Sequence, residues 1–251
     1  MSHHIIEAQN IYFNYPDGHN VINGISFKIL HGESVGIIGS NGAGKSTLLM
    51  LLMGLIFPEK GNISIGEVKI NKKNLNIIRQ RMGMLFQDPD DQLFMPTVYE
   101  DVAFGPRNFN LDEDIVKKRV IEALEKTGTF HLSDRSPCRL SSGEKRSAAL
   151  ASVLSMTPDI LILDEPTSFL DPKSRRRLIN LLNTFKHTKI ITTHDLDMVY
   201  DLCERTIIIK DGKLIADDIS ANLLTNKKLL DSCGLEVPLS LQNCPVCKKA
   251  K

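Results

Sequence analysis

The sequence predicts an α/β fold in which short apolar strands alternate with helices. Three stretches carry this prediction: "SVGIIG" at 34–39, "DILILDE" at 159–165 and "KIITTH" at 189–194. Each contains an uninterrupted apolar run, which is typical of strands that are covered on both faces. Helical segments separate the three stretches along the chain, as a parallel sheet requires.

The N-terminal part of the chain has a different pattern. "IIEAQNIYFNY" and "VINGISFKIL" are β-branched and partly alternating, and the turn residues of "YPDGHN" separate them. This pattern predicts an antiparallel layer near the N-terminus. A helix is predicted from Lys45 to about Gly54, and three short strands follow: "NISIG", "EVKI" and "MGMLFQ" at 82–87.

The middle of the chain, about residues 88–158, is predicted to be an inserted α-helical subdomain. Within it, "LDEDIVKKRVIEALEKTG" has apolar residues on one helical face: Val116, Val120, Ile121 and Leu124. Further on, Asp171 is placed to cap a helix that Pro172 opens. "RTIIIKDGKLIADD" predicts a hairpin that turns on Asp211 and Gly212.

Composition is that of an ordinary globular protein: 251 residues, of which 42% are hydrophobic and 24% charged. Thirty-one basic side chains against thirty acidic ones give no field that would hold nucleic acid or an acidic membrane surface. The longest apolar run, "LLMLLMGLIF", is too short to cross a bilayer, and the N-terminus lacks a secretory signal pattern. Five cysteines without framework spacing indicate reduced thiols. We therefore expect a cytosolic protein that meets a membrane only through a partner.

The stretch "GSNGAGKST" matches the phosphate-loop pattern between a predicted strand and a predicted helix, the context that the motif requires. In such a loop the backbone N–H groups surround the β-phosphate of a nucleotide. Lys45 reaches the β- and γ-phosphate oxygens, and Ser46 binds Mg²⁺. The predicted nucleotide-binding residues are Gly39, Ser40, Asn41, Gly42, Ala43, Gly44, Lys45, Ser46 and Thr47.

Four polar side chains follow the ends of other predicted strands. Asp164 ends one strand and is placed to bind Mg²⁺, whereas Glu165, one residue on, is placed to orient or deprotonate a water. Two acids at such a place can equally cap the next turn. His194 and Gln87 also lie at strand ends, where ligands bind in α/β sheets. The alternative interpretations are a structural histidine and a solvent-facing glutamine.

A second candidate anion site lies in "LSSGEKRSAALASVLSM", residues 140–156. Ser141 and Glu144 have the spacing of a capping box, whose sole task can be to begin a helix. A helix N-terminus lined with small residues such as Ser142 and Gly143 also suits an anion. The residues alone leave both interpretations open.

Together these motifs resemble those of the ATP-binding cassette (ABC) ATPases over about residues 4–220. In family order they are an aromatic in "FNYPDG", the phosphate loop, the Gln87 loop, the LSGGQ-like "LSSGE", "ILILDEP", "SFLD" and "TTHD". The resemblance implies ATP hydrolysis with ATP and Mg²⁺ as cofactors, on a P-loop NTPase (RecA-like) core. It makes Tyr15 the residue that stacks on adenine, with Tyr12 and Phe13 as rivals. It makes Gln87 a Mg²⁺ ligand and water sensor, and Glu165 the catalytic base. It also makes Asp171 a contact across a dimer, and His194 the γ-phosphate switch.

In this family two cassettes pack head to tail. The resemblance therefore implies that Ser141, Ser142 and Gly143 bind the γ-phosphate of ATP on a second ABC ATPase subunit, either a copy of this chain or a paralogue. Ser142 replaces the first glycine of the family motif, and Glu144 replaces its glutamine. Because a glutamate adds negative charge near a phosphate, we expect its carboxylate to fold back into the capping box.

The stretch "LFQDPDDQLFMPTVYEDVAFGPRNFNL", residues 85–111, closely resembles the energy-coupling-factor importer ATPases, which serve cobalt, nickel and vitamin uptake. This resemblance implies a transmembrane coupling subunit, a membrane substrate-binding subunit and a peripheral place on the cytoplasmic face of the cell membrane. The residues alone favour an amphipathic helix with turns around it. The alternatives are a soluble ABC ATPase without a transport role and a regulatory module that binds ATP; Glu165 and His194 argue against an inactive module.

We expect one ABC ATPase domain over residues 4–240 and a tail at 241–251 that contains cysteines and lysines. In this tail "CPVC" places Cys244 and Cys247 at a metal-binding spacing, with Cys233 as a third candidate ligand. Free thiols are the alternative, because a structural zinc site needs four ligands.

Overall fold

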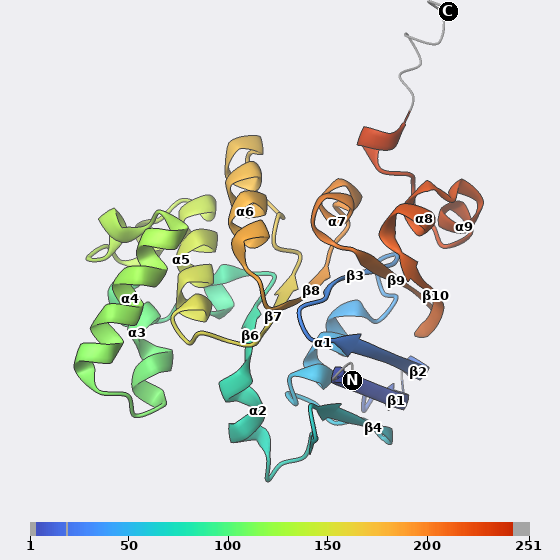
Figure 1. The fold of residues 1–251 in the computed structure, drawn as a ribbon, viewed down its shortest axis with the longest axis horizontal. Coiled ribbons are helices and arrows are strands. Elements are labelled where there is room, and N and C mark those ends of the chain that lie inside the picture. Colours follow the sequence, from blue (N-terminus) through green and yellow to red (C-terminus); the bar gives the residue numbers. More distant parts are fainter. Residues whose placement is uncertain (1–3, 19, 243–251) are drawn as a thin grey trace, which may run out of the picture.

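The core of the molecule is a mostly parallel sheet. The computed structural model describes residues 4–18 and 20–242, and within them this sheet has six strands in the order β10-β9-β3-β8-β7-β6 (Figure 1). Only β10 is antiparallel to its neighbour. All residues of β3, β6, β7 and β8 are buried, which confirms the predicted cover on both faces. The strands are β3 Ser34–Ile38, β6 Met82–Leu85, β7 Ile160–Asp164, β8 Thr188–Thr192, β9 Arg205–Lys210 and β10 Lys213–Ile219.

One face of the parallel sheet is covered by a helix and a second sheet. The described residues form this second sheet with the order β2-β1-β4-β5, and its strands pair antiparallel. Apolar side chains of this sheet, of α1 and of the parallel sheet form one buried cluster. The predicted antiparallel layer is confirmed. These elements are β1 His4–Asn14, β2 Asn20–Leu30, α1 Lys45–Leu52, β4 Lys60–Ile65 and β5 Val68–Lys69.

The other face of the parallel sheet carries helices that share a second buried cluster. Helices α3, α4 and α5 gather beyond β6, at one end of the molecule, and α6 and α7 continue the cover toward β9 (Figure 1). Asp171 caps α6 and Pro172 opens it, as predicted. These helices are α3 Val98–Asn108, α4 Glu113–Thr127, α5 Ser142–Leu154, α6 Pro172–Thr184, α7 Leu196–Leu202, α8 Ser220–Thr225 and α9 Lys227–Ser232.

The stretch 88–158, where an inserted subdomain is predicted, is helical throughout its regular parts. Two 3₁₀ turns lie between α4 and α5, a third precedes α3, and a fourth lies near the end of the described chain. In α4 the buried face contains Val116, Val120 and Leu124 as predicted, but Ile121 is partly exposed and Ala123 is buried in its place. The 3₁₀ turns are η1 Pro89–Asp91, η2 Phe130–Leu132, η3 Pro137–Arg139 and η4 Leu239–Leu241.

Four helices of the described chain, α2, α7, α8 and α9, were not predicted. The helix α2, Leu75–Arg81, connects β5 to β6, where the sequence analysis placed no element. It buries only Ile78, and no side chain of the described residues caps its N-terminus. A helix with a single buried residue leaves no periodic apolar pattern for sequence analysis to detect.

The hairpin between β9 and β10 turns where it was predicted. Asp211 and Gly212 both have positive φ, 49° and 71°, as a two-residue type I′ turn requires. A Cβ atom on Gly212 would lie 2.3 Å from the carbonyl oxygen of Val21, so this turn also needs glycine for its close approach to β2.

Among the described residues, no helix combines the length and the hydropathy needed to span a bilayer.

Candidate nucleotide-binding site

The phosphate loop lies between β3 and α1, at the carboxyl end of the parallel strands. Gly44 has a φ of 100°, which a residue with a side chain rarely adopts. At Gly39, a Cβ atom would lie 2.2 Å from the carbonyl oxygen of Ile209. No described side chain caps α1 and no acid lies in its first turn, so its N–H groups and helix dipole are available to an anion.

Lys45 is held inside this loop by backbone carbonyls. Its Nζ donates to the oxygens of Gly39 at 2.8 Å and Ser40 at 3.1 Å. Burial lowers the pKa of Lys45, while Glu165 and Asp164 act against that shift through space. The ammonium thus lies in a partly desolvated position where a phosphate would strengthen its interactions.

The two acids after β7 have different partners. Asp164 is buried, and its Oδ1 accepts a hydrogen bond of 2.5 Å from Thr192 Oγ1 on β8. Glu165 has a φ of 46°, a conformation that favours glycine, and this turn redirects the chain after the strand. Its Oε2 accepts from Thr193 Oγ1 at 3.1 Å and from the backbone N–H of His194 at 3.2 Å.

The second oxygen of Glu165 has no hydrogen bond to any described residue, although it is buried. It lies 3.3 Å from Nε2 of His194, and the same nitrogen lies 3.4 Å from Nζ of Lys45. A buried carboxylate oxygen that accepts no hydrogen bond is costly, so this position favours a donor from a ligand or a water. Lys45, Glu165 and His194 therefore converge at the phosphate loop.

A cleft of about 500 Å³ brings most of the predicted site together. Gly39, Ser40 and Asp164 do not line this cleft: the carbonyls of the first two accept from Lys45, and Asp164 is buried. The predicted residues that line the cleft are Tyr15, Asn41, Gly42, Ala43, Gly44, Lys45, Ser46, Thr47, Gln87, Glu165 and His194.

Of the three aromatic rivals near the N-terminus, Tyr15 alone lines this cleft. Its hydroxyl lies 3.2 Å from Thr47 Oγ1 at the start of α1. Phe13 is buried and meets the ring of Tyr15 edge to face at 5.1 Å. The hydroxyl of Tyr12 instead lies near Gly24 on β2. The geometry favours Tyr15 among the three as the contact for a base.

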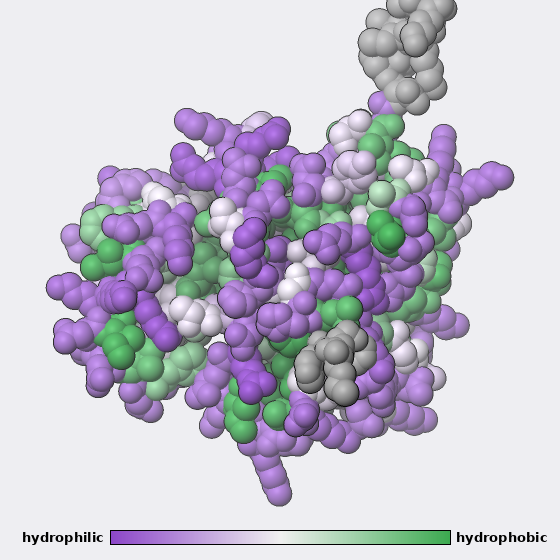
Figure 2. Space-filling model, viewed as in Figure 1, coloured by the Kyte–Doolittle hydropathy of each residue, from purple (hydrophilic) through white to green (hydrophobic). Residues whose placement is uncertain are grey.

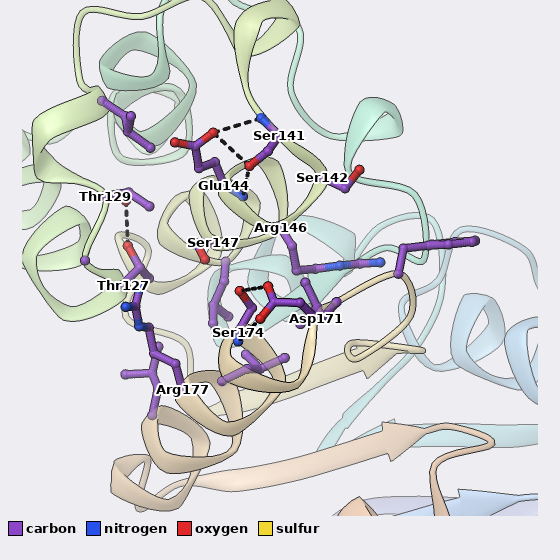
Figure 3. Close-up of a pocket in the computed structure, with 18 of the residues that line it drawn as sticks. Thr127, Thr129, Ser141, Ser142, Glu144, Arg146, Ser147, Asp171, Ser174 and Arg177 are labelled. Carbon is purple, nitrogen blue, oxygen red and sulfur yellow. Dashed lines mark hydrogen bonds between the residues drawn. The ribbon is translucent and has the colours of Figure 1, made fainter.

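The "LSSGE" segment forms the predicted capping box at the start of α5 (Figure 3). Glu144 Oε2 accepts from the backbone N–H and from the hydroxyl of Ser141, both at 2.8 Å. These bonds hold the pKa of Glu144 below its ordinary value. The carboxylate thus folds back as expected, and the Ser142 side chain points away from it and is exposed.

Ser141, Ser142 and Gly143 do not lie in the phosphate-loop cleft. They line a separate pocket of about 410 Å³, together with Asp171. Asp171 accepts from the N–H groups of Lys173 at 2.9 Å and Ser174 at 3.1 Å, so it already has a capping role in its own chain. The two hollows share no lining residue.

Sequence reasoning missed Arg146 on α5. Its side chain is only 3% exposed, and it donates to the carbonyl oxygens of Phe86 at 2.6 Å and Gln87 at 2.5 Å. Arg146 and Phe86 lie about sixty residues apart in the chain, so the local sequence holds no signal for this contact.

In the tail, Cys244 and Cys247 lie outside the described residues. Cys233 is buried, and the described residues contain no group of three that could hold a metal ion.

A phosphate loop, two buried acids at the end of β7 and a mostly parallel sheet define a nucleoside triphosphatase of the P-loop class. The family model described as ABC transporter matches residues 22–168. The chain belongs to this family and is an ABC-type ATPase, which binds and hydrolyses ATP.

Two relatives show how far the similarity extends. A putative ABC transporter ATP-binding protein of Geobacter sulfurreducens is 55% identical over 98% of this chain and 99% of its own length. The energy-coupling factor transporter ATP-binding protein EcfA of Methanosphaera stadtmanae is 45% identical over 93% of this chain and 86% of its own length. The predicted resemblance to energy-coupling-factor ATPases is confirmed.

Two solved structures are similar to the whole fold. CbiO1 of Clostridium perfringens, part of the ABC transporter complex CbiONQ, has a TM-score of 0.81 and 38% identity, covering 91% of this chain and 94% of that one. A dimeric ATP-binding cassette bound to ADP and Pi has a TM-score of 0.78 and 27% identity, covering 86% and 98%. These neighbours confirm the predicted ABC ATPase fold.

Proposed function

We propose that this chain powers import of a small solute, a cobalt or nickel ion or a vitamin, through membrane partner subunits. Its similarity to EcfA and CbiO1 supports this assignment. The observation that carries it is the exposed aromatic pair of Phe94 and Phe104, which follow Gln87 in the chain. In this proposal the chain is a peripheral protein on the cytoplasmic face of the cell membrane.

The site chemistry suits Mg-ATP. The hydroxyl of Ser46, the carboxylate of Asp164 and the amide oxygen of Gln87 are the hard oxygen ligands that Mg²⁺ prefers. A bound Mg²⁺ would neutralise charge on the phosphates. Lys45 binds the β- and γ-phosphates, and Glu165, fixed through Oε2, takes a proton from the attacking water with its free oxygen. His194 lies beside that oxygen and senses the γ-phosphate.

The second half of each site comes from another cassette. Ser141, Ser142 and Gly143 begin an uninterrupted helix of thirteen residues whose N-terminus is exposed. In a head-to-tail dimer this end of α5 faces the γ-phosphate held by the partner's phosphate loop. The dimeric neighbour supports such an arrangement, with either a second copy or a paralogue as partner.

The docking surface for the transmembrane coupling subunit is the exposed pair Phe94 and Phe104. These side chains are 63% and 45% exposed, and their rings meet edge to face at 4.9 Å. Hydrophobic side chains reach the surface at this end of the molecule, over α3 and α4 (Figure 2). An exposed apolar pair of this kind fits the apolar anchors of a partner's short helix.

Hydrogen bonds hold the base of this surface in place. Asp101 on α3 accepts from the backbone N–H groups of Phe94 at 2.9 Å and Met95 at 3.0 Å. Gln92 donates to the carbonyl oxygen of Ala149 on α5 at 2.8 Å. Gln92 also accepts from the backbone N–H of Phe86, so the surface is tied both to α5 and to the Gln87 loop, and in this proposal a change at the γ-phosphate is transmitted through that loop.

Co-purification from membranes tests this function. The full chain, tagged and expressed in its native host, should bring down a transmembrane subunit and a membrane substrate-binding subunit. Reconstituted together, they should show ATPase activity that the solute stimulates. Recovery of an active ATPase that has no membrane partner under mild detergent would favour the alternative, a soluble ABC ATPase without a transport role.

A further inference from the structure

We propose that Arg146 is a positioning residue that couples helix α5 to Gln87 in the same chain. Through it, a nucleotide bound at the N-terminus of α5 fixes the Gln87 loop of the chain's other half-site. This inference rests on the proposed head-to-tail dimer for its second part only. The contact between Arg146 and the Gln87 loop lies within one chain.

The contact has the geometry of a clamp. The planar guanidinium donates through Nη1 to Phe86 and through Nη2 to Gln87, so two successive carbonyls are held by one rigid group. The Gln87 side chain remains exposed and lines the nucleotide cleft. Arg146 thus fixes the backbone of Gln87 and leaves its amide free to reach a ligand.

The charge of Arg146 makes this clamp hard to open. Burial lowers the pKa of Arg146, and Asp88, Asp164 and Glu165 counteract that shift through space. Among the described residues the acids near the guanidinium act on it only through space, so the two carbonyls are its direct partners. A loop that moved away would leave a buried cation without hydrogen bonds, which is strongly unfavourable.

Two further side chains, Lys145 and Gln92, join the same loop to α5, but neither bonds to Gln87. Lys145, which is partly exposed, forms an ion pair of 2.5 Å with the exposed Asp90, and Gln92 bonds to Ala149 and Ser152. The Lys145 pair lies at the surface and is of the kind that contributes little. It therefore supplies a matched control, one residue from Arg146 on the same helix and bonded to the same loop.

The position of Arg146 on α5 gives the coupling its direction. The capping box lies at the first turn of α5, and Arg146 follows Ser142 by one helical turn. Figure 3 shows the Arg146 side chain running away from the hydrogen-bonded pair Ser141 and Glu144. In the proposed dimer the N-terminus of α5 thus contacts the nucleotide bound by the partner. Arg146 on the same helix holds the Gln87 loop, which contacts the nucleotide bound by its own chain.

The test is a double-mutant cycle on the full chain, with the Mg²⁺ concentration for half-maximal ATPase activity as readout. Arg146→Met and Gln87→Ala should each raise that concentration, by about tenfold for loss of hydrogen bonds to a charged group. The double variant should be no worse than either single one, because both act through Gln87. For Arg146→Lys, whose ammonium can bond to one carbonyl, this Mg²⁺ concentration should lie between those of the wild type and Arg146→Met. For Lys145→Met it should equal that of the wild type.

Additive effects of Arg146→Met and Gln87→Ala, or an equal effect of Lys145→Met, would overturn the proposal. Without Mg²⁺, the affinity of every variant for ATP should stay within about twofold of the wild-type affinity, because none of the substitutions lies in the phosphate loop. Amide hydrogen exchange at 86–88 should be faster in Arg146→Met and unchanged in Lys145→Met. If Arg146→Met does not fold, Arg146→Lys decides the same cycle.

The dimer-dependent part has its own readout. In the wild type, ATP hydrolysis should depend cooperatively on ATP, and Arg146→Met should abolish the cooperativity. One outcome is that the wild type hydrolyses ATP without cooperativity while the double-mutant cycle of Arg146 and Gln87 is still non-additive. That result would contradict the head-to-tail dimer and still support the contact between Arg146 and the Gln87 loop. If cooperativity survives in a folded Arg146→Met, the transmission through Arg146 is wrong.

Discussion

His194, which follows β8, contacts both oxygens of the Glu165 carboxylate, which follows β7. The backbone N–H of His194 donates to Oε2 of Glu165 at 3.2 Å, while its ring nitrogen Nε2 lies 3.3 Å from Oε1. The first contact fixes the carboxylate, and the second oxygen stays without a hydrogen bond among the described residues. A fixed carboxylate with one free oxygen is suited to accept a proton from a water.

Glu165→Gln should therefore bind Mg-ATP normally and hydrolyse it at least about a hundredfold more slowly, because the amide cannot accept the proton. Phosphate release and the affinity for a fluorescent ATP analogue measure the two effects separately. Glu204→Gln, an exposed change of the same type, is the control and should leave both unchanged. Wild-type turnover in Glu165→Gln would remove Glu165 from the role of base.

Lys45→Ala should weaken nucleotide binding itself, by about ten- to a hundredfold, because a charge-assisted contact to the phosphates is lost. Equilibrium titration with ATP at constant Mg²⁺ checks this. The effect should be smaller for AMP, which lacks the phosphates that the ammonium reaches. An equal loss for both nucleotides would indicate damage to the loop rather than to the contact.

Mixed dimers test whether the two hollows belong to one site. Lys45→Ala and Ser142→Arg should each be inactive alone, since each removes one half of every site. Mixed together, they should recover activity, because one site of each mixed pair has two intact halves. Glu165→Gln alone should dimerise only with ATP, as measured by sedimentation. No recovery on mixing, together with a single monomeric species at all ATP concentrations, would contradict the dimer.

The capping box predicts a pH dependence of stability. Hydrogen bonds from Ser141 lower the folded-state pKa of Glu144, so the unfolded chain binds this proton more readily. The resulting stabilisation is fully present above the unfolded pKa and is lost as the pH falls through the folded one. Relative to Glu144→Ala, the wild type should be more stable by about 0.5–1 kcal/mol near neutral pH and by less below about pH 4. Urea unfolding at both pH values checks this, with Glu144→Gln, which can accept the same bonds without titrating, as control.

Phe94→Asp and Phe104→Asp should abolish co-purification with the membrane subunit and leave ATP binding by the isolated chain nearly unchanged. Both rings are largely exposed, so the fold should tolerate the charge. Leu239→Asp, at an exposed apolar residue on η4, is the control and should still bind the partner. A large drop in melting temperature would indicate core packing, and a folded Phe94→Asp that retains the partner would place the docking surface elsewhere.

The parts of the site that sequence analysis could predict depend on neighbours in the chain. The phosphate loop, the capping box of Ser141 and the Asp211–Gly212 turn each follow from a few consecutive residues. The contact of Arg146 with Phe86 depends instead on how α5 packs against β6. Local sequence holds no signal for such a contact.

The choice among the aromatic rivals shows the same limit. From sequence alone, Tyr12, Phe13 and Tyr15 are equally good candidates to contact a base. In strand β1, however, Tyr12 faces solvent and Phe13 faces the core. Tyr15 follows the end of that strand, where its hydroxyl reaches Thr47. The register of β1 against β2 decides this outcome, and that register depends on the whole sheet.

The separation of the phosphate-loop cleft from the pocket at Ser141 has a genetic consequence under the proposed dimer. A copy with a defect in one hollow leaves one working site when it pairs with a normal copy. A copy with defects in both, such as Lys45→Ala with Ser142→Arg, leaves none. Such an allele would be dominant, because every normal copy that pairs with it is silenced too.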